Sequence, residues 1–376
     1  CNSKVVYEVL KILNPTLNYQ VGDIARIPVI INEDAKIKNN EMVIKLIEIS
    51  KTDWDSFETS WDFKHHPLVE GSDRISEAYD NWKNKANEMF KQLKENEEEL
   101  NKIFINIYGL QDELKPEEED KDVTVHYIVD KKEDASDSLK ENHYLLTKED
   151  VVKSFISYAV GCMFGRYSLD VEGLAYAGGE WDESKYKTYP ADKDGIIPIC
   201  DNEYFEDDIV SKFVKFVEVV YGEKSLNENL NFIARALGGK GTSREVIRNY
   251  FLNDFFNDHC KTYQKRPIYW LFKSGKKNGF NCLIYMHRYQ PDTIARIRTD
   301  YVYGMQGRYS TAMSDLDNRI KHASESEKVK LNKQLLKIQE QAEEVRVYEE
   351  KSHHLADQNI KIELDDGVKH NYELFE

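Results

Sequence analysis

The chain contains no run of about eighteen apolar residues, so its sequence predicts no membrane-spanning helix and no membrane partner. It also lacks the short paired cysteine spacing on which zinc ribbons depend. Its five cysteines are Cys1, Cys162, Cys200, Cys260 and Cys282. An odd number of unpaired cysteines favours free thiols in a reducing cytosol. We therefore expect a cytoplasmic location.

The chain begins at Cys1 with neither an initiator methionine nor a signal peptide. Two explanations fit: a fragment of a longer protein, or a mature lipoprotein whose Cys1 was lipidated after signal removal. The other cysteines disfavour the lipoprotein, because secreted chains usually pair or avoid cysteine. We therefore expect a fragment.

Signatures of nucleotide and cofactor chemistry are missing as well. There is no phosphate-binding G-x-x-x-x-G-K-[ST] loop. No Pro-Pro dipeptide occurs, so the [DNS]-P-P-[FYW] motif that holds the amino group of a flipped adenine is absent, and so is a Gly-rich strand–turn–helix for S-adenosylmethionine. Gly238–Gly241 precedes a helix and could hold a phosphate, but a plain turn between helices is favoured. Asp254, Asp258 and His259 share one helix, where solvated or capping roles are favoured over metal binding. The sequence thus predicts no catalytic residue, metal ligand or cofactor site in this chain.

The composition is that of a folded protein of two or three domains. Of its 376 residues 40% are hydrophobic, including five Trp and sixteen Phe. The periodicity predicts a mainly α fold with small β elements (α+β), including a β-hairpin and a terminal α-hairpin or coiled coil. The predicted regions are 1–40, the tail of an upstream target-recognition domain; 41–145, a helical spacer with an acidic insertion; 146–308, a helical domain with a basic β-hairpin; and 309–376, a long-helix hairpin and C-terminal tail.

Apolar spacing and capping residues predict several helices. They cover Val5–Leu13, Ser76–Tyr108, Val151–Phe164, Phe205–Tyr221, Leu230–Leu237, Thr242–Phe256, Thr293–Ile320 and Glu325–Leu355. Asn14-Pro15 should stop the first of these. Trp54, Phe57 and Trp61 are spaced as on one helical face, which predicts a packed helix end.

Three β features are expected. Tyr19–Val29 contains a short β-rich run with Pro28 at a strand edge or end. Val123–Val129, within an acidic insertion, could form one strand of a hairpin. The clearest hairpin joins Ile268–Phe272 to Phe280–Met286 through a Lys- and Gly-rich loop. Residues 178–198 should form an exposed, turn-rich loop.

Charge is distributed unevenly along the chain. The net charge of -16 predicts repulsion from a nucleic-acid backbone. Residues 261–308, however, hold ten Lys and Arg against two acids, a local +8 that leaves -24 elsewhere. Aromatic residues are interleaved with these cations, so the segment could neutralise phosphates and stack on bases. The predicted nucleic-acid-binding residues are Lys265, Arg266, Lys273, Lys276, Lys277, Arg288 and Arg298. The alternative is a basic face that pairs with the protein's own acidic segments.

The helix predicted after the hairpin carries two arginines, Arg296 and Arg298, on different faces. Arg296 and Arg298 point about 200° apart on an α-helix, so only one of them can face DNA. Asp292 lies four residues before Arg296 and favours an intramolecular pair there. The sequence therefore favours Arg298 for DNA contact.

Several blocks of the sequence are similar to one family, the BREX (PglX-like) adenine-specific DNA methyltransferases. These blocks are Asn2–Val5, Leu13–Ile24, Asp53–Phe63, Tyr108–Leu110, Ile156–Asp170, Arg266–Phe280 and Leu364–Tyr372. Together they extend over nearly the whole chain. The resemblance is to the C-terminal portion of such proteins, because the family's catalytic motifs precede all of these blocks.

The resemblance implies N6-adenine methylation from S-adenosylmethionine, which marks host DNA in phage defence. Within that activity it implies target recognition and DNA contact for this portion, which we expect to be inactive alone. The implied partners are double-stranded DNA and other defence-system proteins. A protein–protein docking module without DNA binding is the alternative, using the acidic surface and the terminal coiled coil.

Overall fold

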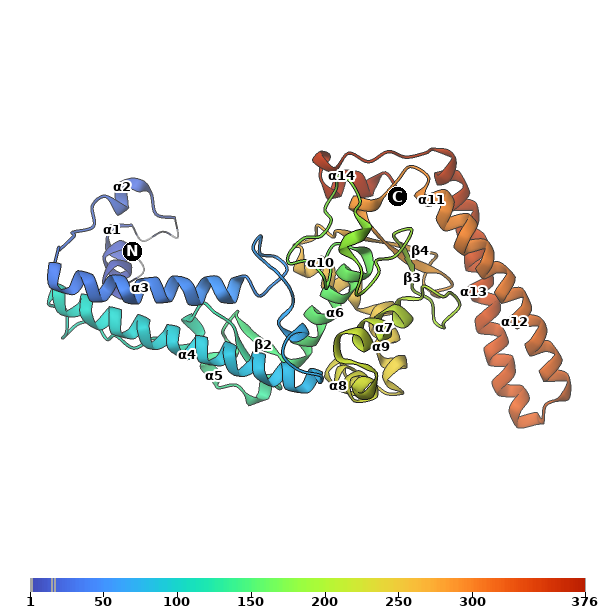
Figure 1. Ribbon diagram of the computed structural model, residues 1–376, viewed down its shortest axis with the longest axis horizontal. Helices are drawn as coiled ribbons and strands as arrows, with labels where there is room; N and C mark the ends of the chain where they lie inside the picture. The colour runs from blue at the N-terminus through green and yellow to red at the C-terminus, as the bar shows by residue number, and fades with distance from the viewer. Residues whose placement is uncertain (1–2, 15, 17, 376) are drawn as a thin grey trace. The chain divides into compact units, whose positions relative to one another are not determined.

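The computed structural model describes residues 3–14, 16 and 18–375, apart from the side chains of residues 33–35, 37 and 38. The fold is mainly α-helical with small β elements, as the sequence predicts (Figure 1). The chain divides into two compact units. Unit 1 comprises Cys1–Phe63 and Glu77–Val151, and unit 2 comprises Lys64–Ser76 and Val152–Glu376. The finer division into four regions stays a prediction.

Unit 1 contains, wholly or for most of their length, helices α1 (Lys4–Leu13), α2 (Val21–Ile24), α3 (Glu33–Trp54), α4 (Ile75–Tyr108) and α5 (Asp137–Lys140). Helix α1 begins after Ser3, whose hydroxyl accepts a hydrogen bond from the Val6 N–H, and it ends at Leu13 as predicted. Pro15 of the predicted stop lies outside the described residues.

The predicted β-rich run over residues 19–29 is wrong, because α2 forms there instead. The Asp23 carboxylate accepts hydrogen bonds from the Gln20 N–H at 3.0 Å and from the Asn14 side-chain amide at 2.8 Å. This local cap satisfies polar groups that a strand could satisfy only with a neighbouring strand.

The predicted packing of Trp54, Phe57 and Trp61 on one helical face is also wrong. Helix α3 ends at Trp54, and turns follow. Trp54 is 56% exposed and Trp61 100% exposed. The Ser60 hydroxyl donates to the Asp55 carboxylate at 2.6 Å. The Ser60 hydroxyl also accepts the Asp62 N–H at 3.1 Å, and side chain-to-backbone bonds of this kind favour turns over a continued helix.

Strands β1 (Tyr127–Val129) and β2 (Leu145–Thr147) pair in parallel, so the hairpin suggested for residues 123–129 is wrong. The connection between the two strands contains α5 and is long enough for a parallel crossover. The Asn87 side chain on α4 bonds both the N–H and the C=O of Ile128, at 2.7 and 3.0 Å. A core packs beneath the strands and includes Phe90, Leu93, Val123, Val125, Val129, Ala135 and Leu139.

Unit 2 contains helices α6 (Lys148–Phe164), α7 (Ile209–Tyr221), α8 (Leu226–Leu237), α9 (Ser243–Asn253) and α10 (Phe255–Thr262). The predicted capping pairs begin α6 and α9. Thr147 and Asp150 bond each other reciprocally, and so do Thr242 and Glu245. The predicted helix to Phe256 is two helices, with the first ending at Asn253. Single helical turns also occur at Pro67–Val69, Asp120–Asp122, Lys132–Asp134, Glu183–Lys185, Glu223–Ser225, Met286–Arg288 and Leu364–Asp366.

A three-stranded antiparallel sheet lies at the centre of unit 2. Strands β4 (Tyr269–Lys273) and β5 (Asn281–Tyr285) form the predicted hairpin, with Leu271 opposite Leu283. Strand β3 (Ile196–Pro198) adds to β5, in the order β3-β5-β4. This strand lies in the segment predicted to be an exposed loop, and it is buried. Isolated apolar residues among turn residues gave too weak a signal to place it.

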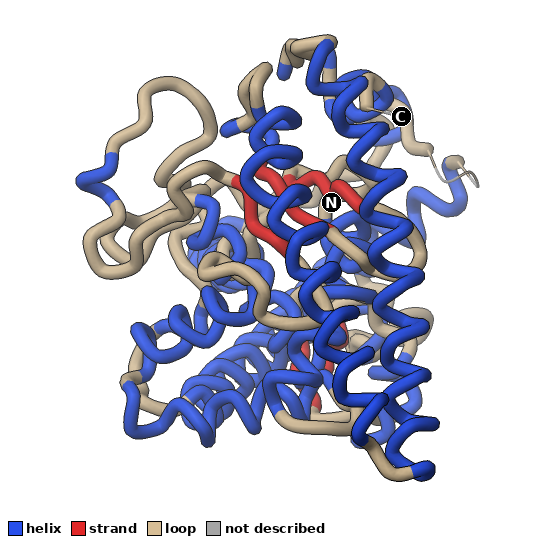
Figure 2. The backbone as a smooth tube through the Cα atoms, turned by 90° about the vertical axis from the view of Figure 1, so that its right-hand side faces the viewer, coloured by secondary structure: helices blue, strands red, loops and turns tan. Residues whose placement is uncertain are grey.

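Long helices follow the hairpin. Helix α11 (Thr293–Arg296) continues through a π-helical turn (Ile297–Val302) into α12 (Tyr303–His322), and α13 (Glu325–Asp357) packs along α12 as the predicted α-hairpin. The short α14 (Val368–Glu373) comes near the end of the chain. Figure 2 shows the two long helices beside the sheet, whose strands are red. In the described part of the chain no helix combines the length and apolarity needed to cross a bilayer.

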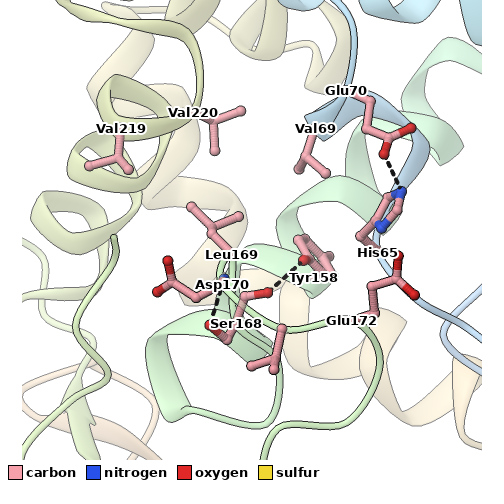
Figure 3. A pocket seen from close by; sticks show the side chains of 11 residues that line it. His65, Val69, Glu70, Tyr158, Ser168, Leu169, Asp170, Glu172, Val219 and Val220 are labelled. Atoms are coloured by element: carbon pink, nitrogen blue, oxygen red, sulfur yellow. Dashed lines mark hydrogen bonds and ion pairs between the residues drawn. The ribbon is translucent and has the colours of Figure 1, made fainter. Parts of the chain in front are cut away.

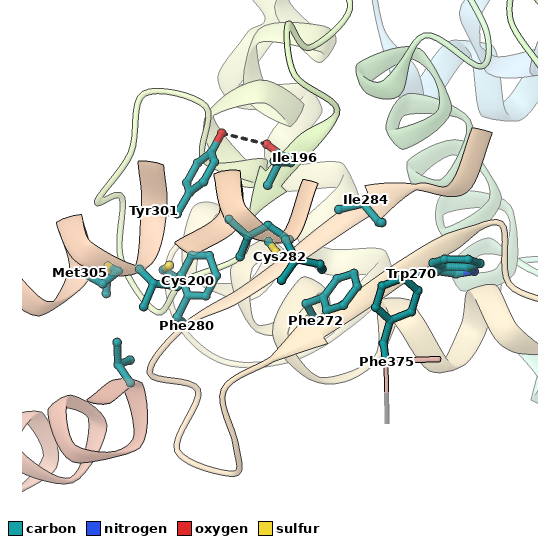
Figure 4. Packing of buried hydrophobic residues seen from close by; sticks show 14 of the residues in the cluster. Ile196, Cys200, Trp270, Phe272, Phe280, Cys282, Ile284, Tyr301, Met305 and Phe375 are labelled. Atoms are coloured by element: carbon teal, nitrogen blue, oxygen red, sulfur yellow. Dashed lines mark hydrogen bonds between the residues drawn. The ribbon is translucent and has the colours of Figure 1, made fainter. Parts of the chain in front are cut away.

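Both strands of the hairpin are anchored by the core between the sheet and these helices (Figure 4). Trp270 and Phe280 are fully buried, and the Trp270 indole donates to the Pro267 carbonyl at 3.1 Å. Other members of this core are Ile196, Cys200, Phe272, Cys282, Ile284, Tyr301, Met305, Tyr309, Val345 and Phe375. The hairpin is therefore a rigid support for whatever side chains it presents.

Candidate nucleic-acid interface

The hairpin carries predicted cations at both ends of strand β4. Lys265 and Arg266 precede the strand, Lys273 ends it, and Lys276 and Lys277 follow in the loop. All five are exposed. At about 3.3 Å per residue of strand, the two groups are roughly 20 Å apart. The structure thus places these cations in two groups on one rigid element.

The loop of the hairpin is held by an acidic side chain of α13. One oxygen of Glu344 accepts hydrogen bonds from the Ser274 hydroxyl at 2.7 Å and from the Gly279 N–H at 3.0 Å. The other oxygen accepts from the Lys277 N–H at 2.7 Å. Burial raises the pKa of Glu344, but the N–H donors of Gly279 and Lys277 outweigh it and keep the pKa below its usual value. The carboxylate is therefore an ionised cap on the loop.

One lysine of the loop forms an ion pair, and the other two do not. The Lys277 ammonium pairs with Glu340 of α13 at 2.7 Å. Among the described residues, no ion pair engages the side chain of Lys273 or Lys276. The loop therefore presents two cations outside any ion pair of the described residues, of which Lys273 lies near the Glu344 charge, and a third that Glu340 partly neutralises.

Lys265 and Arg266 sit on a strained turn after α10. Gln264 and Lys265 have φ angles of 51° and 63°, in the left-handed region that most side chains avoid. The Lys265 N–H donates to the Cys260 carbonyl at 2.7 Å and closes the turn. Within the described part of the chain, neither cation takes part in an ion pair. The turn holds both side chains toward solvent.

The Arg288 side chain is engaged in hydrogen bonds within the protein. Its guanidinium donates to the carbonyls of Phe164, Asp192 and Lys193 at 3.3, 2.6 and 3.0 Å, and lies 4.2 Å from the centre of the Trp181 ring. These bonds join segments more than ninety residues apart in sequence, which local patterns cannot indicate. The geometry gives Arg288 a structural role, and a DNA contact by it stays an untested prediction.

Arg296 and Arg298 both have acidic partners. Arg296 pairs with Asp194 at 3.3 Å, so the expected pair with Asp292 is wrong. Arg298, the residue favoured for DNA, pairs with Glu349 of α13 at 2.7 Å and is half-buried. Arg296 thus has the acidic neighbour expected for one of the two arginines, and Arg298 has one as well, because acids from distant segments approach both faces of the helix.

Three carboxylates beside this helix could hold a metal ion: Asp192, Asp194 and Asp207, whose oxygens lie within 4.8 Å of one another. They already have partners. Lys212 pairs with Asp192 at 2.9 Å, and the Tyr301 hydroxyl bonds Asp194 and Asp207. Burial and then the neighbouring Asp192 raise the pKa of Asp194 to about 7. The cluster is thus compensated internally by protons and cations.

A cavity of about 360 Å³ opens elsewhere in unit 2 (Figure 3). Apolar side chains and the acids Glu70, Asp170 and Glu172 line it. Each acid has a partner: His65 bonds Glu70 at 2.8 Å, Thr188 donates to Asp170, and Lys64 pairs with Glu172. This arrangement leaves no unpaired acid to act on a ligand.

Other sequence candidates also have structural roles. Asp258 pairs with Lys153 and Lys261 at 3.1 and 3.0 Å, and His259 is buried, so the solvated role expected for this helix is wrong for His259. Gly238 ends α8 with φ 73°, as a turn between helices requires. The described cysteines are free thiols, as predicted: Cys162, Cys200, Cys260 and Cys282.

No known family description matches this chain. Two named proteins are similar to it over nearly its whole length. The chain is 42% identical over 382 residues to the adenine-specific methyltransferase PglX of Lacticaseibacillus casei (strain Zhang), which covers 99% of this chain and 30% of that protein. It is 39% identical over 392 residues to the adenine-specific methyltransferase BrxX of Escherichia coli O9:H4 (strain HS), which covers 100% of this chain and 32% of that protein.

The chain therefore spans about a third of the length of these relatives. The blocks singled out in the sequence predict this relationship, and the match is consistent with a C-terminal portion of such a protein. Along its whole length the chain is similar to a portion of the PglX-like adenine-specific methyltransferases.

Proposed function

We propose that this chain is a DNA-contacting, target-recognition portion of an N6-adenine DNA methyltransferase that acts in phage defence in the cytoplasm. The observation that carries the proposal is the set of four exposed cations beside β4 that no ion pair engages among the described residues: Lys265, Arg266, Lys273 and Lys276. The relatives are named as adenine-specific methyltransferases, which supports duplex DNA as the ligand.

The charge distribution explains why only these four cations are proposed to contact DNA. The net charge of -16 repels a polyanion, so binding needs cations that the protein does not already neutralise. Lys277, Arg296 and Arg298 each have a carboxylate partner, and Arg288 has three carbonyls. The free cations can release counterions from DNA, and their rigid support limits the entropy lost on binding.

Two double variants test the proposal, one for each end of β4. Lys265→Ala with Arg266→Ala, and Lys273→Ala with Lys276→Ala, should each weaken binding to all duplexes alike. Each lost phosphate contact should flatten the slope of log affinity against log salt by about 0.9. The measurement is fluorescence anisotropy with labelled duplexes across a salt titration.

Lys277→Ala is the matched control, because Lys277 lies in the same loop but is paired with Glu340. Its salt slope should remain that of the parent chain. Parental slopes in both double variants would contradict the proposal. Failure of the parent chain to bind any duplex, together with co-purification with other defence proteins, would favour the docking module instead.

We further propose that methyl transfer requires residues outside this chain. The support is the missing Pro-Pro and Gly-rich motifs, and S-adenosylmethionine is implied only for the whole protein. The purified chain should neither bind S-adenosylmethionine nor incorporate labelled methyl groups into duplex DNA. Incorporation by the chain alone would overturn this part of the proposal.

A further inference from the structure

Arg166 is a half-buried guanidinium without a carboxylate partner. It follows α6 directly after Gly165, and its backbone carbonyl accepts from the Ala175 N–H at 2.8 Å. Its guanidinium lies 5.2 Å from the centre of the Tyr167 ring and 5.9 Å from that of Tyr263. Over the described residues it forms no ion pair, and its Nε is buried without a hydrogen-bond partner.

His259 is a second buried donor in the same cluster. It is 3% exposed and stacks on Tyr269 with ring centres 4.7 Å apart. Its Nε2 accepts the N–H groups of Ile268 and Tyr269 at 3.0 and 3.1 Å. A neutral imidazole that accepts at Nε2 carries its proton at Nδ1. That Nδ1 has no hydrogen-bond partner in the described structure.

Arg166 and His259 are close enough to influence each other. Burial, and then repulsion from the Arg166 charge, lower the pKa of His259 to about 3. The same two causes lower the pKa of His287, whose Nδ1 is also buried without a partner. Both imidazoles are therefore neutral around Arg166.

The other partly buried arginines of unit 2 are satisfied differently. Arg248 donates two hydrogen bonds to the Asp208 carboxylate, at 2.8 and 2.7 Å, and Arg288 donates to three carbonyls. The aromatic rings around Arg166 and a hydrogen bond with the Tyr285 hydroxyl compensate part of its burial, but no acceptor of the described residues reaches its Nε. A buried charge and buried N–H groups without acceptors cost free energy that an anionic ligand would remove.

We propose that Arg166 and the Nδ1–H of His259 bind a phosphate group of duplex DNA. A phosphate supplies several acceptor oxygens and one delocalised negative charge, which suits a planar guanidinium and a neighbouring N–H donor. The position supports the assignment, because Lys265 and Arg266 lie between His259 and Tyr269 in sequence and border the same cluster. This inference rests on the proposed DNA contact and adds a deeper anchor to it.

The test compares Arg166→Met and Arg166→Lys with the parent chain. Thermal unfolding is followed at equal ionic strength with sodium phosphate or sodium chloride, because a ligand that binds only the folded state raises the melting temperature. Phosphate should raise the melting temperature of the parent chain, and should no longer do so in Arg166→Met. The lysine variant keeps the charge without the planar fork and should retain only part of the effect.

The direction of the change in melting temperature distinguishes a binding role of Arg166 from a structural role. Without phosphate, Arg166→Met should melt no lower than the parent chain, because it removes an unpaired buried charge. The matched control is Arg288→Met, which removes the hydrogen-bond donor of three backbone carbonyls. This variant should have a lower melting temperature than the parent chain, and phosphate should still raise its melting temperature.

DNA titrations complete the test. Arg166→Met should flatten the salt slope for duplex DNA by about 0.9, one phosphate contact. Phosphate stabilisation of the parent chain with an unchanged slope in Arg166→Met would mean free phosphate binding only, and would overturn the DNA assignment. No phosphate effect on the parent chain and an unchanged slope would overturn the proposed phosphate site itself. Absence of DNA binding by the parent chain with phosphate stabilisation intact would refute the proposed function instead.

Discussion

Replacing Glu344 by alanine should loosen the hairpin loop without disturbing the core beneath it. The carboxylate accepts hydrogen bonds from the Ser274 hydroxyl and from the N–H groups of Lys277 and Gly279. A buried hydrogen bond to a charged acceptor contributes about 1.5–3 kcal/mol, but this loop is partly exposed and water can replace the acceptor in part. At roughly 0.5–1 kcal/mol for each of the three bonds, the loss should be about 1.5–3 kcal/mol.

The assay is amide hydrogen exchange by mass spectrometry on peptides covering β4, the loop and β5. The free energy of local opening at the loop amides should fall by the amount given above, while the amides of α7 and α8 keep their protection. Glu343→Ala is the matched control on the same helix. Glu343 is exposed and, among the described residues, pairs with Arg346 alone, so its removal should leave the loop amides unchanged.

The contribution of Glu344 should also depend on pH in a defined direction. Its pKa in the folded protein is below the ordinary value of 4.5. The stabilisation is therefore complete above about pH 4.5 and is lost as the pH falls through the lower, folded-state pKa. Equal loop exchange in the Glu344 and Glu343 variants at neutral pH would refute the capping role.

Further predictions concern packing and titration. A Cβ at Gly279 would lie 2.8 Å from the Gln341 carbonyl oxygen, so Gly279→Ala should destabilise by about 1–3 kcal/mol in urea unfolding. Gly307→Ala, in helix α12 with no atom within 4 Å of the new Cβ, should stabilise instead; the same sign for both would contradict the packing. Burial and Asp192 raise the pKa of Asp194 to about 7, so the folded state binds more protons than the unfolded state and stability falls as the pH rises from about 4 to 7. Asp194→Asn should remove that fall and gain at most about 1–2 kcal/mol above pH 7 after solvent screening, and a pH profile parallel to the parent's would refute this.

The elements that the sequence predicted are those specified by local patterns. The hairpin Tyr269–Tyr285 has apolar strands joined by a Gly-rich loop, and the pairs Thr147–Asp150 and Thr242–Glu245 mark helix starts within four residues. Each signal lies within a short window of sequence. Local free energies therefore decide these elements.

Strand β3 and the pairing of the interface cations could not be predicted, because they depend on contacts between distant segments. Strand β3 forms because β5 offers it an unpaired edge, and its own few residues give no strand signal. The candidate interface shows the same limit. Lys276 and Lys277 are neighbours in sequence, but only Lys277 meets an acid, more than sixty residues away on α13. The same holds for Arg166, whose surroundings include Tyr263 and His287, both more than ninety residues away in sequence.

The π-helical turn at Ile297–Val302 has a consequence for the long helix that follows. Ile297, Tyr301, Met305 and Tyr309 are all buried against the sheet at a constant spacing of four residues. In a regular α-helix that spacing drifts by about 40° per step, so the fourth side chain would point some 120° away from the first. The wider turn absorbs part of this drift, because its hydrogen bonds skip one more residue. One additional residue thus keeps the row in phase with the sheet, and its deletion would rotate everything beyond it, including the end of the helix that α13 packs against.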